Sequence, residues 1–279
     1  MIAKPAPTVE AGVALNRSGT GAPLVLLHAL GSSRHAWNPV IPTLSDDFDV
    51  IAVDLPGFGD SAPLPGAAEP TPAALAAAIA DALDAAGVRR PHVVGNSLGG
   101  WIALELAALR PLASLTLLSP AGLWSRDTPA YCRISLRATR WLTTHLPRVL
   151  NRLVNHRFGR ILVLGQSHGR PARTSPEQAR AAIRAVGTCV GFDATLTATI
   201  HRRYAPQAPV DVPVTVAFGS RDRILLRRQW RRTDMLPSNS IVERLPRCGH
   251  IPMADDPAAV MRLITRSVAR AAHDRRPMT

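Results

Sequence analysis

The chain has 279 residues, of which 46% are hydrophobic, and its formal net charge at pH 7 is +13. This length allows one large domain or a domain with a sizeable insertion, and the composition excludes a disordered chain. The N-terminal residues contain no apolar segment of the signal-peptide type, and no apolar run reaches membrane-spanning length, so we expect a cytoplasmic protein. The three cysteines are far apart and form no CxxC pair, so we expect isolated thiols, no full disulfide framework and no metal site.

The positive charge is concentrated in one part of the chain. Residues 123–205 contain 14 arginines and only three acidic residues. This leaves 19 of the 33 basic and 17 of the 20 acidic residues for the remainder, which is therefore nearly balanced. We expect a core made of residues 1–122 and 206–279, with residues 123–205 forming a separate Arg-rich insertion.

Short apolar segments alternate with helical patterns outside this insertion. The first, VEAGVALNR (9–17), is predicted to be an antiparallel edge strand. The predicted buried strands are PLVLLH, which ends at His28, FDVIAVD (48–54), PHVVG (91–95), ASLTLLSP (113–120), VPVTVAFG (212–219) and SIVERL (240–245). The predicted helices of the core are 73–87, 97–110, 227–236 and 257–272. Strands that are apolar on both faces and alternate with helices indicate an α/β fold, in which helices flank a mostly parallel sheet.

The insertion has a different pattern, because it contains no strong strand signal. Residues 133–146 have helical spacing, and so do residues 175–186, where Ser175 is suited to the N-cap and Pro176 to the first helical position. We therefore predict that residues 123–205 form a helical cap between two strands of the sheet.

The segment HVVGNSLGGW (92–101) places a serine between glycines where a predicted strand meets a predicted helix. A turn this sharp strains its central residue and brings backbone segments close together, so flanking glycines remove Cβ atoms that would clash. The Ser97 side chain then projects from the carboxyl edge of the sheet, where open α/β sheets bind ligands. The neighbouring helix N-terminus favours negative charge there. We predict that Ser97 is a nucleophile suited to attack a carbonyl.

A serine nucleophile needs a base, and the base needs an acid that orients it. FGSRD overlaps the end of the predicted strand 212–219 and places Asp222 just after it. CGH follows the last predicted strand and places His250 there. Taken alone, Asp222 could cap a following helix and His250 could be an ordinary loop histidine. Because all three residues follow strands, in the order Ser97, Asp222, His250 that this architecture uses, we predict a catalytic triad.

The chemistry also needs two N–H donors that stabilise an oxyanion. LLHALGSS (26–33) follows the first buried strand of the core, and we predict that the backbone N–H groups of Leu30 and Leu98 form the oxyanion hole. His28 has a polar side chain in the same loop, which we expect to hold the loop by hydrogen bonds.

Four segments, LLHALGSSRHAW, VDLPGFGDS, VGNSLGGW and FGSRD with CGHIPM, resemble the α/β-hydrolase superfamily, and more narrowly its capped esterase and carbon–carbon-bond hydrolase branch. The resemblance implies the same triad and oxyanion donors, no metal or organic cofactor, and a helical lid at 123–205. Two residues depart from the pattern of this branch. Ala29 stands where many relatives have Gly, and Ile251 stands where carbon–carbon hydrolases of aromatic degradation often have Trp. The serine at position 97 differs from the Asp that epoxide hydrolases and haloalkane dehalogenases use.

We therefore expect a serine hydrolase that cleaves a carboxylic ester or thioester through an acyl-enzyme, with a small-molecule acyl substrate. Hydrolysis of a carbon–carbon bond in a diketone-type substrate is an alternative. A ligand-binding protein that keeps this fold without turnover is another.

The predicted helix 133–146 has two distinct faces. Arg133, Arg137 and Arg140 lie on one face at i, i+4 and i+7, while Ile134, Ala138, Trp141 and Leu142 lie largely on another. Such an arginine row is typical of a solvated surface. It would also suit a lid that attracts an acidic substrate, such as an acyl-CoA or acyl-carrier thioester, or an anionic membrane surface.

No nucleic-acid recognition motif accompanies the positive charge, so we do not expect nucleic acid as a partner. The insertion also holds Trp124, Tyr131 and Trp141, which are candidates for lining a substrate pocket. Core packing is the more common use of such aromatic residues.

Overall fold

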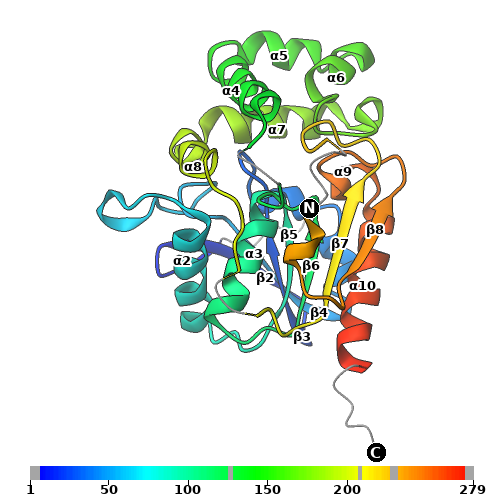
Figure 1. The fold of residues 1–279 in the computed structure, drawn as a ribbon. Coiled ribbons are helices and arrows are strands. Elements are labelled where there is room, and N and C mark those ends of the chain that lie inside the picture. Colours follow the sequence, from blue (N-terminus) through cyan, green and yellow to red (C-terminus); the bar gives the residue numbers. More distant parts are fainter. Residues whose placement is uncertain (1–6, 125–127, 207–208, 227–231, 274–279) are drawn as a thin grey trace, which may run out of the picture.

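The computed structural model describes residues 7–124, 128–206, 209–226 and 232–273. Their centre is an eight-stranded sheet in the order β1-β2-β4-β3-β5-β6-β7-β8 (Figure 1). The strands are β1 (Thr8–Glu10), β2 (Val13–Ser18), β3 (Ala22–Leu27), β4 (Phe48–Val53), β5 (His92–Asn96), β6 (Ser114–Leu118), β7 (Val214–Gly219) and β8 (Ile241–Leu245). Pairing is parallel from β4 to β8 and antiparallel for β1 with β2 and β2 with β4. The predicted α/β fold is confirmed, and all six predicted strands of the core lie within two residues of their predicted bounds. The prediction that 240–245 is buried is wrong, because β8 is the last strand of the sheet and only its Leu245 is buried.

The predicted edge strand 9–17 is in fact a hairpin. Strand β1 ends at Glu10, and β2 returns from Val13 after a two-residue turn. Ala11 and Gly12 both have positive φ, at 47° and 80°, which matches the type of tight turn whose twist fits two antiparallel strands. The alternating pattern of the sequence continues through this turn, so it does not reveal the reversal.

The sheet is covered on both faces because its strands are apolar on both sides. All residues of β4, β5, β6 and β7 are buried. In β3, Val25 and Leu27 pack into the core cluster that includes α2 (Pro72–Ala85) and α3 (Leu98–Leu109). Leu24 and Leu26 belong to the opposite cluster, which includes α10 (Pro257–His273). This two-sided burial is what holds the ends of the strands in fixed register.

In the described part of the chain between β6 and β7, five α-helices form the cap over the carboxyl edge of the sheet (Figure 1). They are α4 (Ala130–His145), α5 (Pro147–Leu153), α6 (Arg157–Leu164), α7 (Pro176–Thr188) and α8 (Phe192–Thr199). The predicted N-cap of α7 is present as a capping box, in which Ser175 Oγ accepts from the Gln178 N–H and the Gln178 side chain accepts from the Ser175 N–H. A small core of Leu150, Val154, Leu164, Ala179 and Ile183 joins α5, α6 and α7.

Short helices complete the described chain. They are α1 (Ile41–Leu44), α9 (Pro252–Asp255) and the 3-10 turns η1 (Arg34–Trp37), η2 (Pro65–Ala67), η3 (Pro171–Arg173) and η5 (Thr233–Met235). Of the predicted helix 227–236, residues 227–231 lie outside the described residues, and the described part contains only the turn η5. Within the described ranges, no helix is both long enough and apolar enough to cross a membrane.

Candidate active site

Ser97 lies in the turn between β5 and α3, in a strained backbone conformation. Its φ is +54° and its ψ is −113°, a region that residues with a side chain rarely adopt. The turn is held on both sides, because the Ser97 N–H donates to the Leu118 carbonyl and its own carbonyl accepts from Ala121 N, each at 2.9 Å. Its side chain is therefore fixed at the carboxyl edge of the central strand.

The glycines beside Ser97 are required by backbone packing. A Cβ on Gly95 would collide with the backbone of Gly99, and a Cβ on Gly99 would collide with the carbonyl oxygens of Leu27 and His28. Because the obstructing atoms belong to the backbone, they cannot move aside as a side chain would. Helix α3 thus starts directly against the end of β3, which brings the turn and the His28 loop together.

Asp222 and His250 form a buried pair at the ends of β7 and β8. His250 Nδ1 lies 2.8 Å from Asp222 Oδ2, and both residues are less than a tenth exposed. The other carboxylate oxygen, Oδ1, accepts from the N–H groups of Ile224 and Leu225 at 2.9 Å each. Asp222 therefore does both of the things considered from the sequence: it caps the following turn and it holds the histidine.

These contacts determine the charge and the tautomer of the pair. Burial alone would raise the pKa of Asp222, but the charge and hydrogen bond of His250, together with the N–H groups of Leu225 and Ile224, hold that pKa below its usual value. An ionised Asp222 accepts from Nδ1–H of His250, so Nε2 of the imidazole is left as an acceptor. That is the atom a general base uses to receive a proton.

Asn96 connects the serine turn to the histidine loop. Its Nδ2 donates to the backbone carbonyls of Leu118 and His250, both at 2.9 Å, and its side chain is buried. The residue that precedes Ser97 is thus bonded directly to His250. Among the described residues, the Ser97 hydroxyl makes no hydrogen bond to the His250 ring, so the predicted proton transfer between them stays a prediction.

The cap holds the other side of the histidine loop. The Ser167 carbonyl accepts from the N–H groups of His250 and Ile251 at 2.8 and 3.1 Å. Asp255, which is buried, accepts from the N–H groups of Gly169, Arg170 and Gly249 at 2.7 to 2.8 Å. Cap residues 167–170 and core residues 249–251 are therefore bound to each other through their backbones.

The two predicted oxyanion donors have free N–H groups. Leu98 is the first residue of α3, and Leu30 lies in the loop after β3. Neither backbone N–H donates a hydrogen bond to any other residue that the structure describes. Both groups are thus available to a bound oxygen, and their role as the oxyanion hole stays a prediction.

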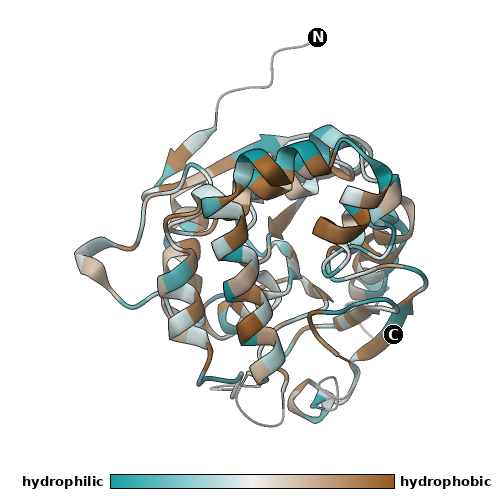
Figure 2. Cartoon of the chain, turned by 90° about the horizontal axis from the view of Figure 1, so that it is seen from above, coloured by the Kyte–Doolittle hydropathy of each residue, from teal (hydrophilic) through white to brown (hydrophobic). Residues whose placement is uncertain are grey.

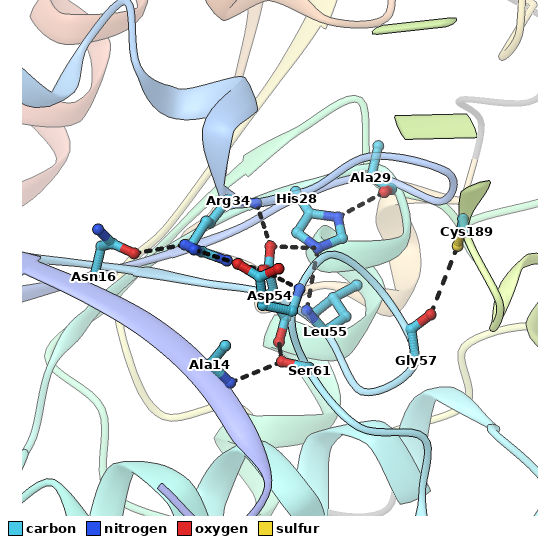
Figure 3. A network of polar contacts seen from close by, with 11 residues as sticks. Ala14, Asn16, His28, Ala29, Arg34, Asp54, Leu55, Gly57, Ser61 and Cys189 are labelled. Carbon is cyan, nitrogen blue, oxygen red and sulfur yellow. Dashed lines mark hydrogen bonds and ion pairs between the residues drawn. The ribbon is translucent and has the colours of Figure 1, made fainter. Parts of the chain in front are cut away.

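His28 holds the loop, as we expected. Its Nδ1 donates to the Ala29 carbonyl at 2.8 Å, and its Nε2 accepts from the Leu55 N–H at 3.1 Å (Figure 3). Burial, opposed by the charge of Asp54, lowers the pKa of His28, so the ring is neutral at pH 7. With both nitrogens engaged, this side chain is not an oxyanion donor.

A buried ion pair supports the same loop from below. Arg34 contacts Asp54 through its guanidinium, and the Arg34 N–H donates to Asp54 Oδ1 at 2.6 Å (Figure 3). Asp54 Oδ2 also accepts from the Asp60 N–H at 2.9 Å, and a Cβ on Gly59 would collide with this carboxylate. The DLPGFGD segment thus acts as the structural support of the loop that bears Leu30.

A cavity of about 480 Å³ lies between the cap and the core. Its wall includes Ser32 and Ser33, which follow the Leu30 loop, and Ile251, which follows His250. The cap side is formed by residues of α7, such as Ala185, and by the buried His168. Ser97, Asp222 and His250 do not line the cavity, so it adjoins the candidate site from the side of the oxyanion loop.

The aromatic residues of the cap do not line this cavity. Trp124 is buried in the core, where it packs edge-on against Trp101 and its Nε1–H donates to the Arg202 carbonyl at 3.0 Å. Tyr131 and Trp141 are 48% and 55% exposed. The idea that they are pocket aromatics is therefore not supported by their placement.

The cysteines are free and buried, as expected from their spacing. Burial raises the pKa of Cys189 to about 11 and that of Cys132 and Cys248 to about 12, so the three thiols are protonated at pH 7. Within the described residues, no three His, Cys, Asp or Glu side chains are grouped as metal ligands.

Sequence reasoning missed two residues that organise the site. Asn96 could have been suspected, since it directly precedes Ser97 in the turn motif. Asp255 gave no signal, because its three partners come from the cap and from the histidine loop, and only the folded chain brings them together.

Comparisons with known proteins agree with this architecture. An uncharacterised protein of Mycobacterium tuberculosis is 28% identical over 89% of this chain and 76% of its own length. The epoxide hydrolase EphH of the same organism is 28% identical over 66% of this chain and 88% of its own. The solved structure of a thermophilic esterase from Thermogutta terrifontis has the same fold, with a TM-score of 0.74, 23% identity and 93% of each chain covered. The model of the alpha/beta hydrolase family matches residues 24–263, and the chain belongs to that family.

Proposed function

We propose that this protein is a serine hydrolase that cleaves a carboxylic ester or thioester through an acyl-enzyme on Ser97. The observation that carries the proposal is the buried His250–Asp222 pair, whose hydrogen bond leaves Nε2 of His250 as an acceptor, together with the strained turn at Ser97. Asn96 links the two parts of the site through the His250 carbonyl. The resemblance places an Asp at this turn in epoxide hydrolases, but this chain has Ser97 there, which favours acyl transfer.

The first half of the reaction forms the acyl-enzyme. Nε2 of His250 takes the hydroxyl proton as Ser97 Oγ attacks the carbonyl carbon, and the electron pair of the C=O bond moves to its oxygen. Collapse of this intermediate breaks the bond to the alkoxide or thiolate, which leaves with the proton from His250. Because the ring and the hydroxyl are not hydrogen-bonded in the structure, we expect a small adjustment of the side chains when substrate binds.

The second half releases the acid. Water gives a proton to His250 while its oxygen attacks the acyl carbon, and Ser97 recovers the proton as the carboxylic acid departs. In both halves the N–H groups of Leu30 and Leu98 would stabilise the oxyanion, an effect worth about 2.7–4 kcal/mol per donor in one protease. The residues of the chain suffice for every step.

The cavity beside the oxyanion loop is the proposed space for part of the substrate. Its α7 side includes the small side chains of Ala181, Ala182 and Ala185, so a larger side chain at one of these positions would reduce the space. We expect Ala185→Trp to raise the KM for substrates with bulky groups and to leave the KM for acetyl esters nearly unchanged. An equal effect on both would contradict this assignment.

Active-site labelling tests the proposal directly. A fluorophosphonate should label the wild-type protein and fail to label Ser97→Ala. Ser114→Ala, which removes another buried serine hydroxyl far from the turn, should be labelled normally. Asp222→Asn should lower kcat by about 10⁴, since the amide favours the wrong histidine tautomer.

A substrate panel then identifies the reaction. Esters and thioesters of varied acyl size are compared with a vinylogous diketone and an epoxide. Full activity of Ser97→Ala on any of them would overturn the mechanism. Preferred turnover of the diketone would replace it with carbon–carbon bond hydrolysis, and labelling without any turnover would favour a ligand-binding role.

A further inference from the structure

We infer that the outer face of the cap docks on an anionic lipid bilayer surface. The outer cap face is defined by exposed residues of α4, α5 and α6, namely Ile134, Arg137, Trp141, Leu142, Arg148, Val149, Arg152, Leu153, Arg157, Phe158, Ile161 and Leu162. This inference concerns binding and does not depend on the proposed reaction.

Helix α4 buries Cys132 and packs Leu136 against the core, but it leaves its other large apolar residues in solvent. Its apolar residues Ile134 and Trp141 are 68% and 55% exposed. The stripe that faces the protein contains Thr139 and the buried Thr143, which form hydrogen bonds to Gln166 and to the helix backbone. A helix that buries hydroxyl groups and exposes Trp and Ile has an outer face that water does not favour.

Arg140 is a charged residue of α4 that faces the protein and not the solvent. It turns inward, where its guanidinium lies 5.5 Å from the centre of the Phe192 ring and donates to the Val186 carbonyl at 2.5 Å. Its Nε also pairs with Asp193 at 3.3 Å. Arg140 thus fixes α4 to α7 and α8, while Arg137 of the same row stays exposed.

Helices α5 and α6 continue the apolar surface. In α6, Phe158 and Leu162 are one turn apart and are 83% and 77% exposed. Val149 of α5 is 48% exposed. Figure 1 places α4, α5 and α6 on the side of the cap away from the sheet, and Figure 2, which looks down on the cap, shows brown hydrophobic stretches along its helices.

The charge of this surface has one sign. Between Asp127 and Glu177 the chain contains nine arginines and no acidic residue. The exposed residues Arg148, Arg152 and Arg157 have no carboxylate partner in the described part of the chain. Large apolar side chains mixed with unpaired arginines are the composition of helices that lie in the interface of anionic membranes.

The same charge disfavours a second copy of the chain as the occupant. In a two-fold symmetric dimer the same patch meets itself, so these arginines would face arginines with no carboxylate between them. An anionic bilayer supplies both the negative charge and the hydrocarbon that Phe158 and Leu162 would enter.

Vesicle co-sedimentation tests the inference with the Ser97→Ala protein, so that any hydrolysis plays no part. We expect strong binding to phosphatidylcholine vesicles that contain about one-third phosphatidylglycerol, weak binding to phosphatidylcholine alone, and release by salt. Arg148→Gln with Arg152→Gln should weaken binding by about tenfold or more, since each arginine near such a surface contributes about fivefold. Phe158→Ser with Leu162→Ser should weaken it by at least about tenfold.

Matched changes on the core serve as controls. Arg244→Gln with Arg262→Gln removes two exposed arginines, and Leu109→Ser with Val242→Ser removes two apolar side chains that are 54% and 52% exposed. Both should bind vesicles like the parent. The inference would be overturned by an equal loss of binding in these controls, by equal binding to neutral vesicles, or by no binding to the anionic vesicles. In the last case, cap-dependent dimers or capture of an acidic carrier protein would identify a different occupant.

Discussion

Replacing Asp255 with Ala should destabilise the protein strongly. The Asp255 carboxylate is 8% exposed and accepts three backbone N–H groups, two from the cap at Gly169 and Arg170 and one from the core at Gly249. Alanine would leave these donors without an acceptor at a junction where the backbones pack too tightly for a Cβ on either glycine.

The size of the effect follows from the number of orphaned donors. A buried donor that loses its acceptor costs about 1–3 kcal/mol, which gives an upper limit near 9 kcal/mol for three. Neighbouring contacts are not additive and water can enter, so we expect about 3–5 kcal/mol. For a chain of this length that corresponds to a fall in Tm of roughly 10 °C.

The assay is thermal unfolding of Asp255→Ala beside Asp256→Asn. Asp256 is the neighbouring carboxylate, and its Oδ1 accepts from the Ala259 N–H, a contact that asparagine can keep. The control should therefore lie within about 1 kcal/mol of wild type. Below the Tm, Asp255→Ala should also show a lower kcat, because Gly249 adjoins His250. A Tm within 2 °C of the control would refute the argument that this carboxylate joins the cap to the histidine loop.

Three further predictions concern the site. Gly99→Ala should lower the free energy of unfolding by more than about 3 kcal/mol or prevent folding, because its Cβ meets backbone that cannot move aside. Gly87→Ala, at positive φ in open space, should lower it by about 1–2 kcal/mol, and the denaturant midpoints of the two variants measure the difference. Asn96→Ala should cost about 1–3 kcal/mol and lower kcat, and unchanged kinetics in the folded variant would refute its role in positioning His250. Burial lowers the pKa of His168, so below about pH 6.5 the unfolded chain binds more protons than the folded protein and the stability declines as the pH falls. His168→Gln should therefore flatten the dependence of Tm on pH in this range, and an unchanged slope would contradict this reasoning.

The core and the pairing of Asp222 with His250 could be predicted because local chemistry determines them. A buried parallel strand must be apolar on both faces, and the turn at Ser97 must have glycines where backbone meets backbone. The ends of β7 and β8 then bring Asp222 and His250 together without any long-range information beyond the order of the strands. The hairpin at Ala11 was missed for the same kind of reason, because a two-residue turn can occur inside a continuous alternating pattern.

The cap could be predicted only in part, since an amphipathic pattern gives two helix faces but does not say which one is buried. The usual rule would bury Ile134 and Trp141 and leave the arginine row in water. Arg137 follows this rule and is exposed, but Arg140 turns inward, because α7 and α8 offer it a carbonyl, a carboxylate and the face of an aromatic ring. Such partners lie some fifty residues away in sequence and exist only once the helices have packed, so the exposed apolar surface of the cap is a property of the fold and not of the local pattern.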